Sequence, residues 1–431
     1  MKIIFFFFCL SFLIVNAEKK EDVVEVKIVM KPYPQKSLSF LLQDSTRTSY
    51  TFSLPLNETQ KMSQFSCKQK EKEINVQFIS KEEKERMEII VELQPNEQQE
   101  EMKFECQWNM IDSLLNYPKV KDVDDPYKFL TTISLCPISS QLKCRSSILK
   151  VAHDTISMSI KPKEETSSKI TFKPMIIEHE DEQFTFVVYH FSTRFESMTF
   201  SSVKKVININ KNDHYVHMEI EDMKNNGAQL EKEFFRSDFR RGGVFLSEIK
   251  MNIEKESSNL EYRDTTGLIT TGRLIPYDKH VTLQLPTRYP LLGGWKTSFE
   301  VNYNYPYDIS IQQINTKKRF ITPLKIDLNG IVTKSELEIV LPEGATITSI
   351  HYPKQHVLSE EIYNQKSFGT TFTKPVVKLT FDHVDLHSLP GSIEIYYEEN
   401  PVAEKTKNII VSCLASSIIL IIILYAKIIN N

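Results

Sequence analysis

Glycine and tryptophan are scarce in this sequence, and neither sign of charge predominates. The 431 residues include only 11 glycines and 2 tryptophans, but 26 phenylalanines and 17 tyrosines. So little glycine argues against a flexible low-complexity chain, and so many aromatic residues are typical of strands with packed faces. Lysine and arginine number 53 against 56 acidic residues. The chain therefore lacks the basic excess of a nucleic-acid-binding protein, and we expect no nucleic-acid partner.

The motifs of common enzyme classes are also missing. The sequence contains no G-x-S-x-G, H-E-x-x-H, Walker or dinucleotide-binding pattern, which argues against a hydrolase, a metalloprotease or a nucleotide-dependent enzyme. Two acidic clusters, at 122–125 and 178–182, have oxygen ligands of the kind that Ca²⁺ prefers. Both clusters lie between strand patterns and are interpreted as solvated turns. We therefore expect no catalytic residue, no metal ligand and no cofactor.

Apolar residues alternate with polar ones along most of the chain, which is the period of a half-buried strand. The alternating apolar positions of the first half are Val24, Val26, Ile28 and Met30; Ile74, Val76 and Phe78; Met87, Ile89, Val91 and Leu93; and Met102, Phe104, Cys106, Trp108 and Met110. Later strands are expected at 206–209, 216–220, 337–341, 377–381 and 393–397. The sequence predicts a mainly β fold with two β-sandwich-like domains, at 18–200 and 201–402, followed by a single transmembrane helix.

Both ends of the sequence carry apolar segments. Residues 1–17 have one lysine, an apolar core and a small residue at Ala17, so they are interpreted as a cleaved secretory signal peptide. Residues 408–426 are apolar and, at about 1.5 Å per residue, long enough to cross a membrane as a helix. The expected order is lumenal domains, a juxtamembrane link at 403–407, the membrane helix at 408–426 and a short cytosolic tail at 427–431. This is the single-pass type I orientation.

Small residues lie on one face of the predicted membrane helix. They are Ser412, Ala415 and Ser416. Small side chains let a partner helix approach closely, and the alternative is that this face only contacts lipid.

Four cysteines and one sequon lie in the predicted lumenal part. The cysteines are Cys67, Cys106, Cys136 and Cys144. An oxidising compartment favours disulfides, and four thiols allow three pairings. Pairing Cys136 with Cys144 would close a short loop and leave Cys67 to join Cys106; unpaired buried thiols are the alternative. The sequon Asn57-Glu-Thr follows Pro55 in a connecting segment, so we expect a glycan at Asn57, with an unmodified turn as the alternative.

The most informative segment is 287–306. Pro290 and the pair Gly293–Gly294 predict a tight turn. The apolar positions of the following strand are Phe299, Val301, Tyr303 and Tyr305.

Within this segment, residues 288–297 have the sequence Arg-Tyr-Pro-Leu-Leu-Gly-Gly-Trp-Lys-Thr. This sequence resembles the hallmark segment of the ribophorin I family. Three further segments resemble the family in the same order: Leu-Glu-Tyr-Arg-Asp-Thr-Thr-Gly from Leu260, Leu-Pro-Glu-Gly-Ala from Leu341, and Phe368-Gly369 with the run 375–378. The resemblance covers 203–400 well and 18–200 faintly. The matched motif residues are Tyr262, Arg263, Asp264, Arg288, Tyr289, Pro290, Gly293, Gly294, Trp295 and Lys296.

The resemblance implies a non-catalytic, membrane-anchored subunit of the oligosaccharyltransferase of the endoplasmic reticulum. That complex transfers a dolichol-linked oligosaccharide to the Asn of Asn-X-Ser/Thr in nascent polypeptides, through a separate polytopic subunit with a Trp-Trp-Asp-Tyr-Gly motif that is missing here. The implied partners are the other subunits, nascent polypeptide and membrane lipid. The implied work is bracing the catalytic subunit and presenting acceptor chains, with the matched residues in an architectural role. A cell-surface adhesion or receptor ectodomain with one membrane span is the alternative.

Overall fold

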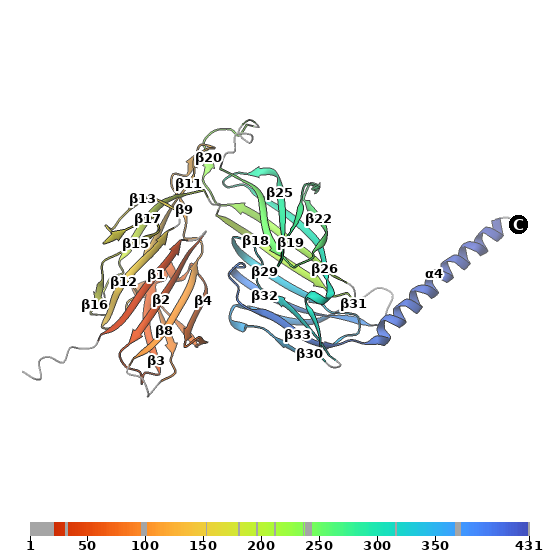
Figure 1. Ribbon diagram of the computed structural model, residues 1–431, viewed down its shortest axis with the longest axis horizontal. Helices are drawn as coiled ribbons and strands as arrows, with labels where there is room; N and C mark the ends of the chain where they lie inside the picture. The colour runs from red at the N-terminus through yellow and green to blue at the C-terminus, as the bar shows by residue number, and fades with distance from the viewer. Residues whose placement is uncertain are drawn as a thin grey trace, which may run out of the picture. The chain divides into compact units, whose positions relative to one another are not determined.

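The computed structural model describes residues 21–429, apart from 31–32, 96–100, 152, 180–181, 195–196, 211–212, 236, 238–243, 315–316 and 367–371 (Figure 1). The predicted signal peptide at 1–17 and the motif residues Phe368 and Gly369 lie outside the described residues. Nearly all the described elements are strands, so the predicted mainly β fold is confirmed.

The chain divides into two compact units. The first comprises Met1–Leu115 and Leu130–Phe191, and the second comprises Asn116–Phe129 and Ser192–Asn431. The short segment 116–129 therefore belongs to the second unit, although it interrupts the first in the sequence.

The first unit is built mainly on a 9-stranded sheet, with order β14-β15-β12-β1-β2-β8-β4-β5 and β16 beside β12. Strand β1 pairs with β2 antiparallel and with β12 parallel. The bounds in this sheet are β1 Asp22–Met30, β2 Pro34–Leu42, β4 Met62–Gln69, β5 Lys72–Glu73, β8 Met102–Met110, β12 Leu142–Val151, β14 Glu164–Glu165, β15 Lys169–Thr171 and β16 Met175–Ile177.

Two smaller sheets and two short helices accompany it. The strand orders of these two sheets are β3-β7-β6 and β13-β17-β11-β9. The residues of β11 are divided between the two units. The bounds are β3 Ser49–Pro55, α2 Leu56–Thr59, β6 Val76–Lys81, η1 Glu82–Lys84, β7 Arg86–Glu92, β9 Leu115–Asn116, β11 Tyr127–Ser134, β13 Asp154–Met158 and β17 Phe186–Thr193.

The alternation read from the sequence places the core of the first unit correctly in three of four stretches. In β1, β7 and β8 the predicted inward residues include Val26, Ile89 and Phe104, which are all buried. The exception is Phe78 on β6, which is 47% exposed because no layer covers this strand, whose residues are exposed on both faces. Ile74 precedes β6 and is not part of it. Alternation predicts a strand there, but it cannot tell that no second layer covers its face.

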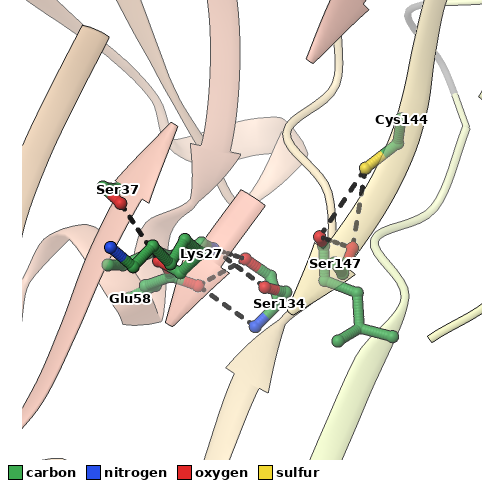
Figure 2. Close-up of polar contacts among 8 residues, drawn as sticks. Lys27, Ser37, Glu58, Ser134, Cys144 and Ser147 are labelled. Carbon is green, nitrogen blue, oxygen red and sulfur yellow. Dashed lines mark hydrogen bonds and ion pairs between the residues drawn. The ribbon is translucent and has the colours of Figure 1, made fainter. Parts of the chain in front are cut away.

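A buried ion pair ties α2 to the core of the first unit. The Lys36 side chain is fully buried, and its ammonium donates to Glu58 Oε1 at 2.8 Å, to the Ser134 carbonyl oxygen at 2.9 Å and to Ser134 Oγ at 2.6 Å. The Ser134 hydroxyl in turn donates to Glu58 Oε2 (Figure 2). All three ammonium protons are used, which is the condition under which a buried charge is tolerated. Removing one partner of such a pair typically costs about 3–5 kcal/mol.

The cysteines of the first unit form one disulfide. Cys67 on β4 and Cys106 on β8 face each other across the sheet and are bonded. Cys136 and Cys144 are buried free thiols, so the second predicted bond is not formed in this structure. Burial raises the pKa of Cys136, and a hydrogen bond from Cys136 lowers the pKa of Cys144. Cys144 Sγ also lies 3.6 Å from Ser147 Oγ (Figure 2).

The largest sheet of the second unit has 8 strands, in the order β23-β22-β26-β19-β18-β29-β32-β31. The strands expected at 206–209 and 216–220 lie in β18 and β19, which pair antiparallel, and β18 pairs with β29 in parallel. The bounds are β18 Met198–Asn208, β19 Asp213–Asn225, β22 Ser258–Asp264, β23 Gly267–Leu268, β26 Lys296–Pro306, β29 Ile331–Val340, β31 Ser359–Lys366 and β32 Thr373–Asp385.

Three smaller sheets complete the second unit, with orders β21-β25-β24, β27-β28-β33-β30 and β10-β20. One continuous apolar core draws residues from the 8-stranded sheet and from the first two of these. The bounds are β10 Val120–Lys121, β20 Gln229–Leu230, β21 Leu246–Ile253, β24 Arg273–Pro276, β25 Val281–Leu291, η2 Tyr307–Ile309, β27 Ile311–Ile314, β28 Lys317–Pro323, β30 Thr346–His351, η3 Lys354–His356 and β33 Ser392–Glu398.

Helix α4 (Pro401–Ile429) follows the last strand. Asn400 caps it through a side-chain oxygen that accepts the Val402 N–H at 3.0 Å. Ala403 is buried, and a side chain at Gly344 would lie 2.9 Å from its Cβ. Residues 403–407, predicted to be a juxtamembrane link, lie near the start of this helix.

The membrane prediction has a mixed outcome. Residues 408–426 are helical, but none of the helices in the described ranges combines the length and apolarity that a membrane crossing requires. The structure therefore does not show the predicted transmembrane span. Ser412, Ala415 and Ser416 are exposed on α4, and the Ser416 hydroxyl donates to the Ser412 carbonyl oxygen at 2.8 Å.

We expect the disulfide to be a large contributor to the stability of the first unit. Cys67 and Cys106 are separated by 39 positions, and a cross-link of this loop length constrains the unfolded chain by about 4 kcal/mol. Replacing both cysteines with alanine should lower the urea midpoint of the first unit. Adding dithiothreitol to the wild type should lower its midpoint by a similar amount. The double variant should not respond to dithiothreitol. A wild-type midpoint that dithiothreitol leaves unchanged would contradict this.

The core of the second unit should lose stability in mild acid because of His214. This ring is fully buried beside Tyr305 and Phe320, and burial lowers its pKa to about 4. In the unfolded chain the group has its ordinary pKa near 6.5. The unfolded state therefore binds the extra proton as pH falls from about 6.5 to about 4, and stability declines by roughly 3 kcal/mol over that window, with no further loss from this group below it.

Urea unfolding at pH 7 and pH 4.5 measures this decline. The His214→Leu variant should show a smaller decline than the wild type, while the exposed control His383→Leu should decline as the wild type does. Equal pH slopes for wild type and His214→Leu would refute the assignment.

Candidate functional site

The motif residues come together at one end of the second unit. Tyr262, Arg263 and Asp264 end β22, and Arg288 to Pro290 lie near the end of β25. Gly293 and Gly294 form the turn, and Lys296 begins β26. The predicted turn is thus narrower than expected, since Pro290 still belongs to the strand. Because β22 pairs with β26, two matched segments that are far apart in the sequence become neighbours. We call this set the motif surface.

A two-pronged ion pair joins the two halves of the motif surface. Arg288 Nε donates to Asp264 Oδ2 at 2.7 Å, and an Arg288 terminal nitrogen donates to Asp264 Oδ1 at 2.9 Å. Asp264 Oδ1 also accepts the backbone N–H groups of Thr266 and Gly267, both at 2.9 Å. The Arg288 hydrogen bond holds the pKa of Asp264 below its usual range. This geometry fixes the β22–β23 turn against β25.

The other polar motif residues also have structural partners. Tyr262 is buried and meets the ring of Phe299 edge-on at 5.7 Å. Lys296 pairs with Asp222 at 2.9 Å on the surface, and Arg263 lies 3.7 Å from Glu261. Exposed pairs of this kind contribute little to stability.

The glycines of the motif allow a close backbone contact. A Cβ on Gly293 would lie 1.9 Å from the Ala228 carbonyl oxygen, so no other residue fits without movement of the backbone. Gly294 has φ +82°, a left-handed conformation that favours glycine. The Gly294 N–H donates to the Asn225 carbonyl oxygen at 2.8 Å. The turn is therefore built against the end of β19.

Asn225 connects the turn to the inserted segment 116–129. Its side-chain nitrogen donates to the Leu291 carbonyl oxygen and to the Tyr127 hydroxyl oxygen, both at 3.0 Å. The Tyr127 ring covers Gly227, where a Cβ would lie 2.1 Å from it. Neither Asn225 nor Tyr127 is recognisable from the sequence as a contact residue. Only the pair Asn225-Asn226 before Gly227 signalled a turn, and nothing indicated that Tyr127 would contact it.

Lys121 holds the inserted segment in shape. Its ammonium donates to the carbonyl oxygens of Asp122, Asp125 and Val244, at 3.2, 2.7 and 3.2 Å, and lies 4.8 Å from the Tyr127 ring centroid. Burial lowers the pKa of Lys121. The acidic cluster at 122–125 thus uses backbone oxygens to bind a lysine, and its aspartate side chains are exposed. Among the described residues, no group of three or more His, Cys, Asp or Glu side chains is placed to hold a metal ion.

Two motif aromatics point away from this framework. Tyr289 is 69% exposed and Trp295 is 52% exposed, and Leu268 nearby in the motif surface is 58% exposed. Leu268 and Arg288 also line a groove of about 640 Å³, with residues 269–271 and 273 among its other lining residues. An architectural role explains Arg288, Asp264 and Gly293, but it does not explain large apolar side chains in solvent.

Gly293 offers a direct test of the close contact. Alanine at this position would push a methyl group into the Ala228 carbonyl oxygen, so Gly293→Ala should destabilise the second unit by about 1–3 kcal/mol. The matched control is Gly272→Ala, whose Cβ would meet no backbone atom but only side-chain atoms of Leu260, Tyr262 and Leu285, at 3.3, 3.4 and 3.6 Å. Urea midpoints of the two variants compare them. Equal midpoints would show that the turn relaxes freely and that the contact is no constraint.

Comparisons with known proteins agree on one family. The sequence model described as Ribophorin I matches residues 23–426. Dolichyl-diphosphooligosaccharide–protein glycosyltransferase subunit 1A of Arabidopsis thaliana is 28% identical over 225 residues, which cover 49% of this chain and 35% of that protein. Subunit 1 of Schizosaccharomyces pombe is 24% identical over 188 residues, covering 42% and 41%. The chain therefore spans well under two thirds of the length of these relatives.

Among solved structures, an M1 zinc metallopeptidase from Deinococcus radiodurans is 8% identical over 47% of this chain and 42% of its own, with a TM-score of 0.26. So low a score carries no argument. The family match, in contrast, extends over most of the sequence. This chain belongs to the ribophorin I family.

Proposed function

We propose that this chain is a non-catalytic subunit of the oligosaccharyltransferase complex. In this role it braces the catalytic subunit and presents acceptor chains while that subunit transfers a dolichol-linked oligosaccharide to the Asn of Asn-X-Ser/Thr in nascent polypeptides. The supporting observation is the family match over residues 23–426, together with relatives named as subunits of the dolichyl-diphosphooligosaccharide–protein glycosyltransferase.

The contacts of the motif surface support a bracing role. Its charged groups hold strands together: Arg288 is bound to Asp264, and Lys296 to Asp222. Its glycines permit backbone packing. Each of these groups is occupied within the chain, so the motif serves as a rigid platform.

We assign the contact with a partner to the exposed aromatics of that platform. Tyr289 and Trp295 offer large, stiff and partly apolar surfaces, which are enriched at protein interfaces and carry much of their binding energy. The proposed partners are other subunits of the complex and the nascent polypeptide.

The proposed location is the endoplasmic reticulum membrane, with the chain as a type I protein. Residues 1–17 are the signal peptide, 18–200 and 201–402 are lumenal β-sandwich-like domains, 408–426 cross the membrane and 427–431 are cytosolic. The helical conformation of α4 and its exposed isoleucines support this assignment of the span. The small residues Ser412, Ala415 and Ser416 then face a partner helix.

Co-purification tests the proposal. The Tyr289→Ala/Trp295→Ala double variant should recover at least about tenfold less of the polytopic catalytic subunit in mild detergent than the wild type, because interface aromatics are often worth 2 kcal/mol or more. Cells that carry the variant should under-occupy sequons on secretory glycoproteins. The control is Tyr363→Ala, an exposed tyrosine on β31 at the other edge of the 8-stranded sheet.

Two results would refute the proposal. One is a wild-type chain that recovers no glycosyltransferase subunit. The other is a pool of the chain that surface biotinylation labels on intact cells, which would favour an adhesion or receptor role.

A further inference from the structure

The sequon of the first unit lies on a rigid part of the structure. Asn57 is exposed in the single turn of α2, and the next residue, Glu58, is buried and bound to Lys36 at 2.8 Å. The Thr59 hydroxyl donates to the Leu56 carbonyl oxygen at 2.9 Å. Because the middle residue of the sequon is fastened to the core, the direction in which the Asn57 side chain leaves the surface is fixed.

Asn57 also lines a groove in the first unit. The groove has a volume of about 820 Å³, and its lining comes from α2 and its flanking residues, from 84–86 and from Gln183, Phe184 and Phe186. Its volume is within the range of roughly 300–1,000 Å³ that holds small ligands. A group attached to Asn57 would therefore lie next to this groove. Part of the groove's lining, residues 183–186, is distant from Asn57 in the sequence.

The lining of this groove has the chemistry that sugars use. Phe184 and Phe186 are half-buried, with ring centroids 6.2 Å apart, and they offer apolar faces to the C–H groups of a pyranose ring. The Arg86 guanidinium lies 5.4 Å from the Phe184 ring and donates to the Glu182 carbonyl oxygen, which holds this wall in place. Gln60 and Gln183 are exposed at the rim, and their amides can donate to and accept from hydroxyl groups.

We propose that this groove is the seat of the N-linked glycan carried by Asn57. The first N-acetylglucosamine lies across the groove with one face toward Phe184, instead of projecting into solvent. The inference rests on the proposed function, since only a chain that enters the lumen meets the glycosylation machinery. A sugar bound there covers two half-buried aromatic rings and joins α2 to the start of β17.

Hydrogen exchange can test whether the glycan contacts the groove, because it is measured on a peptide far in sequence from Asn57. The full-length chain is produced in cells that attach only high-mannose glycans and is trimmed by endoglycosidase H to one N-acetylglucosamine. The comparison is Asn57→Asp, which carries no sugar and has the residue that complete enzymatic removal would leave. In the peptide covering 183–188, amide exchange should be about fivefold slower in the trimmed protein than in Asn57→Asp.

Two aromatic variants show whether Phe184 makes the contact. In Phe184→Ala the difference between trimmed protein and Asn57→Asp should disappear. In Phe78→Ala, which changes an exposed ring outside the groove, the difference should remain.

Two outcomes overturn the proposal. One is an unmodified Asn57 in the intact mass of the wild-type protein. The other is a modified Asn57 with equal exchange at 183–188 in trimmed protein and Asn57→Asp, which would mean that the glycan projects into solvent. Neither outcome affects the proposed function, because membership of the complex is measured by co-purification of the catalytic subunit.

Discussion

The backbone contact between Gly293 and the Ala228 carbonyl is the constraint on which the motif surface depends. No Cβ fits at this position, so the turn between β25 and β26 packs on the chain that follows β19. Asn225 then completes the junction by bonding Leu291 on one side and Tyr127 on the other. The hallmark turn, the end of β19 and the inserted segment thus meet through a close backbone contact at Gly293 and through the side-chain amide of Asn225.

Within the motif, the charged residues and the aromatic residues have different roles. Its charged residues satisfy one another, as Arg288 does with both oxygens of Asp264, and a satisfied ion pair of this kind positions strands without offering a free group for chemistry. Its aromatic residues Tyr289 and Trp295 are left in solvent. A surface that is rigid underneath and apolar outside is suited to holding another protein, which is the role proposed for a bracing subunit.

The first unit uses a buried polar connection in a comparable way. Lys36, Glu58 and Ser134 come from three separate elements, and their mutual hydrogen bonds fix α2 on the core. Leaving any one of these buried groups unpaired would cost free energy of folding, and this cost fixes the position of α2. In both units the feature of functional interest, Trp295 in one and Asn57 in the other, stands on a segment fixed by contacts with residues distant in the sequence.

Sequence alone determined the class of fold and located several of the long strands, because alternation is a local signal of which side chains face a core; Val26 and Tyr303 are buried as their spacing requires. It also located the residues of the motif. Tertiary structure decided what those residues do. Phe78 is exposed because no other part of the chain covers its strand, and the contact between Tyr127 and Asn225 joins positions 98 residues apart. Such contacts depend on how distant strands are brought together, and no pattern confined to neighbouring residues encodes that.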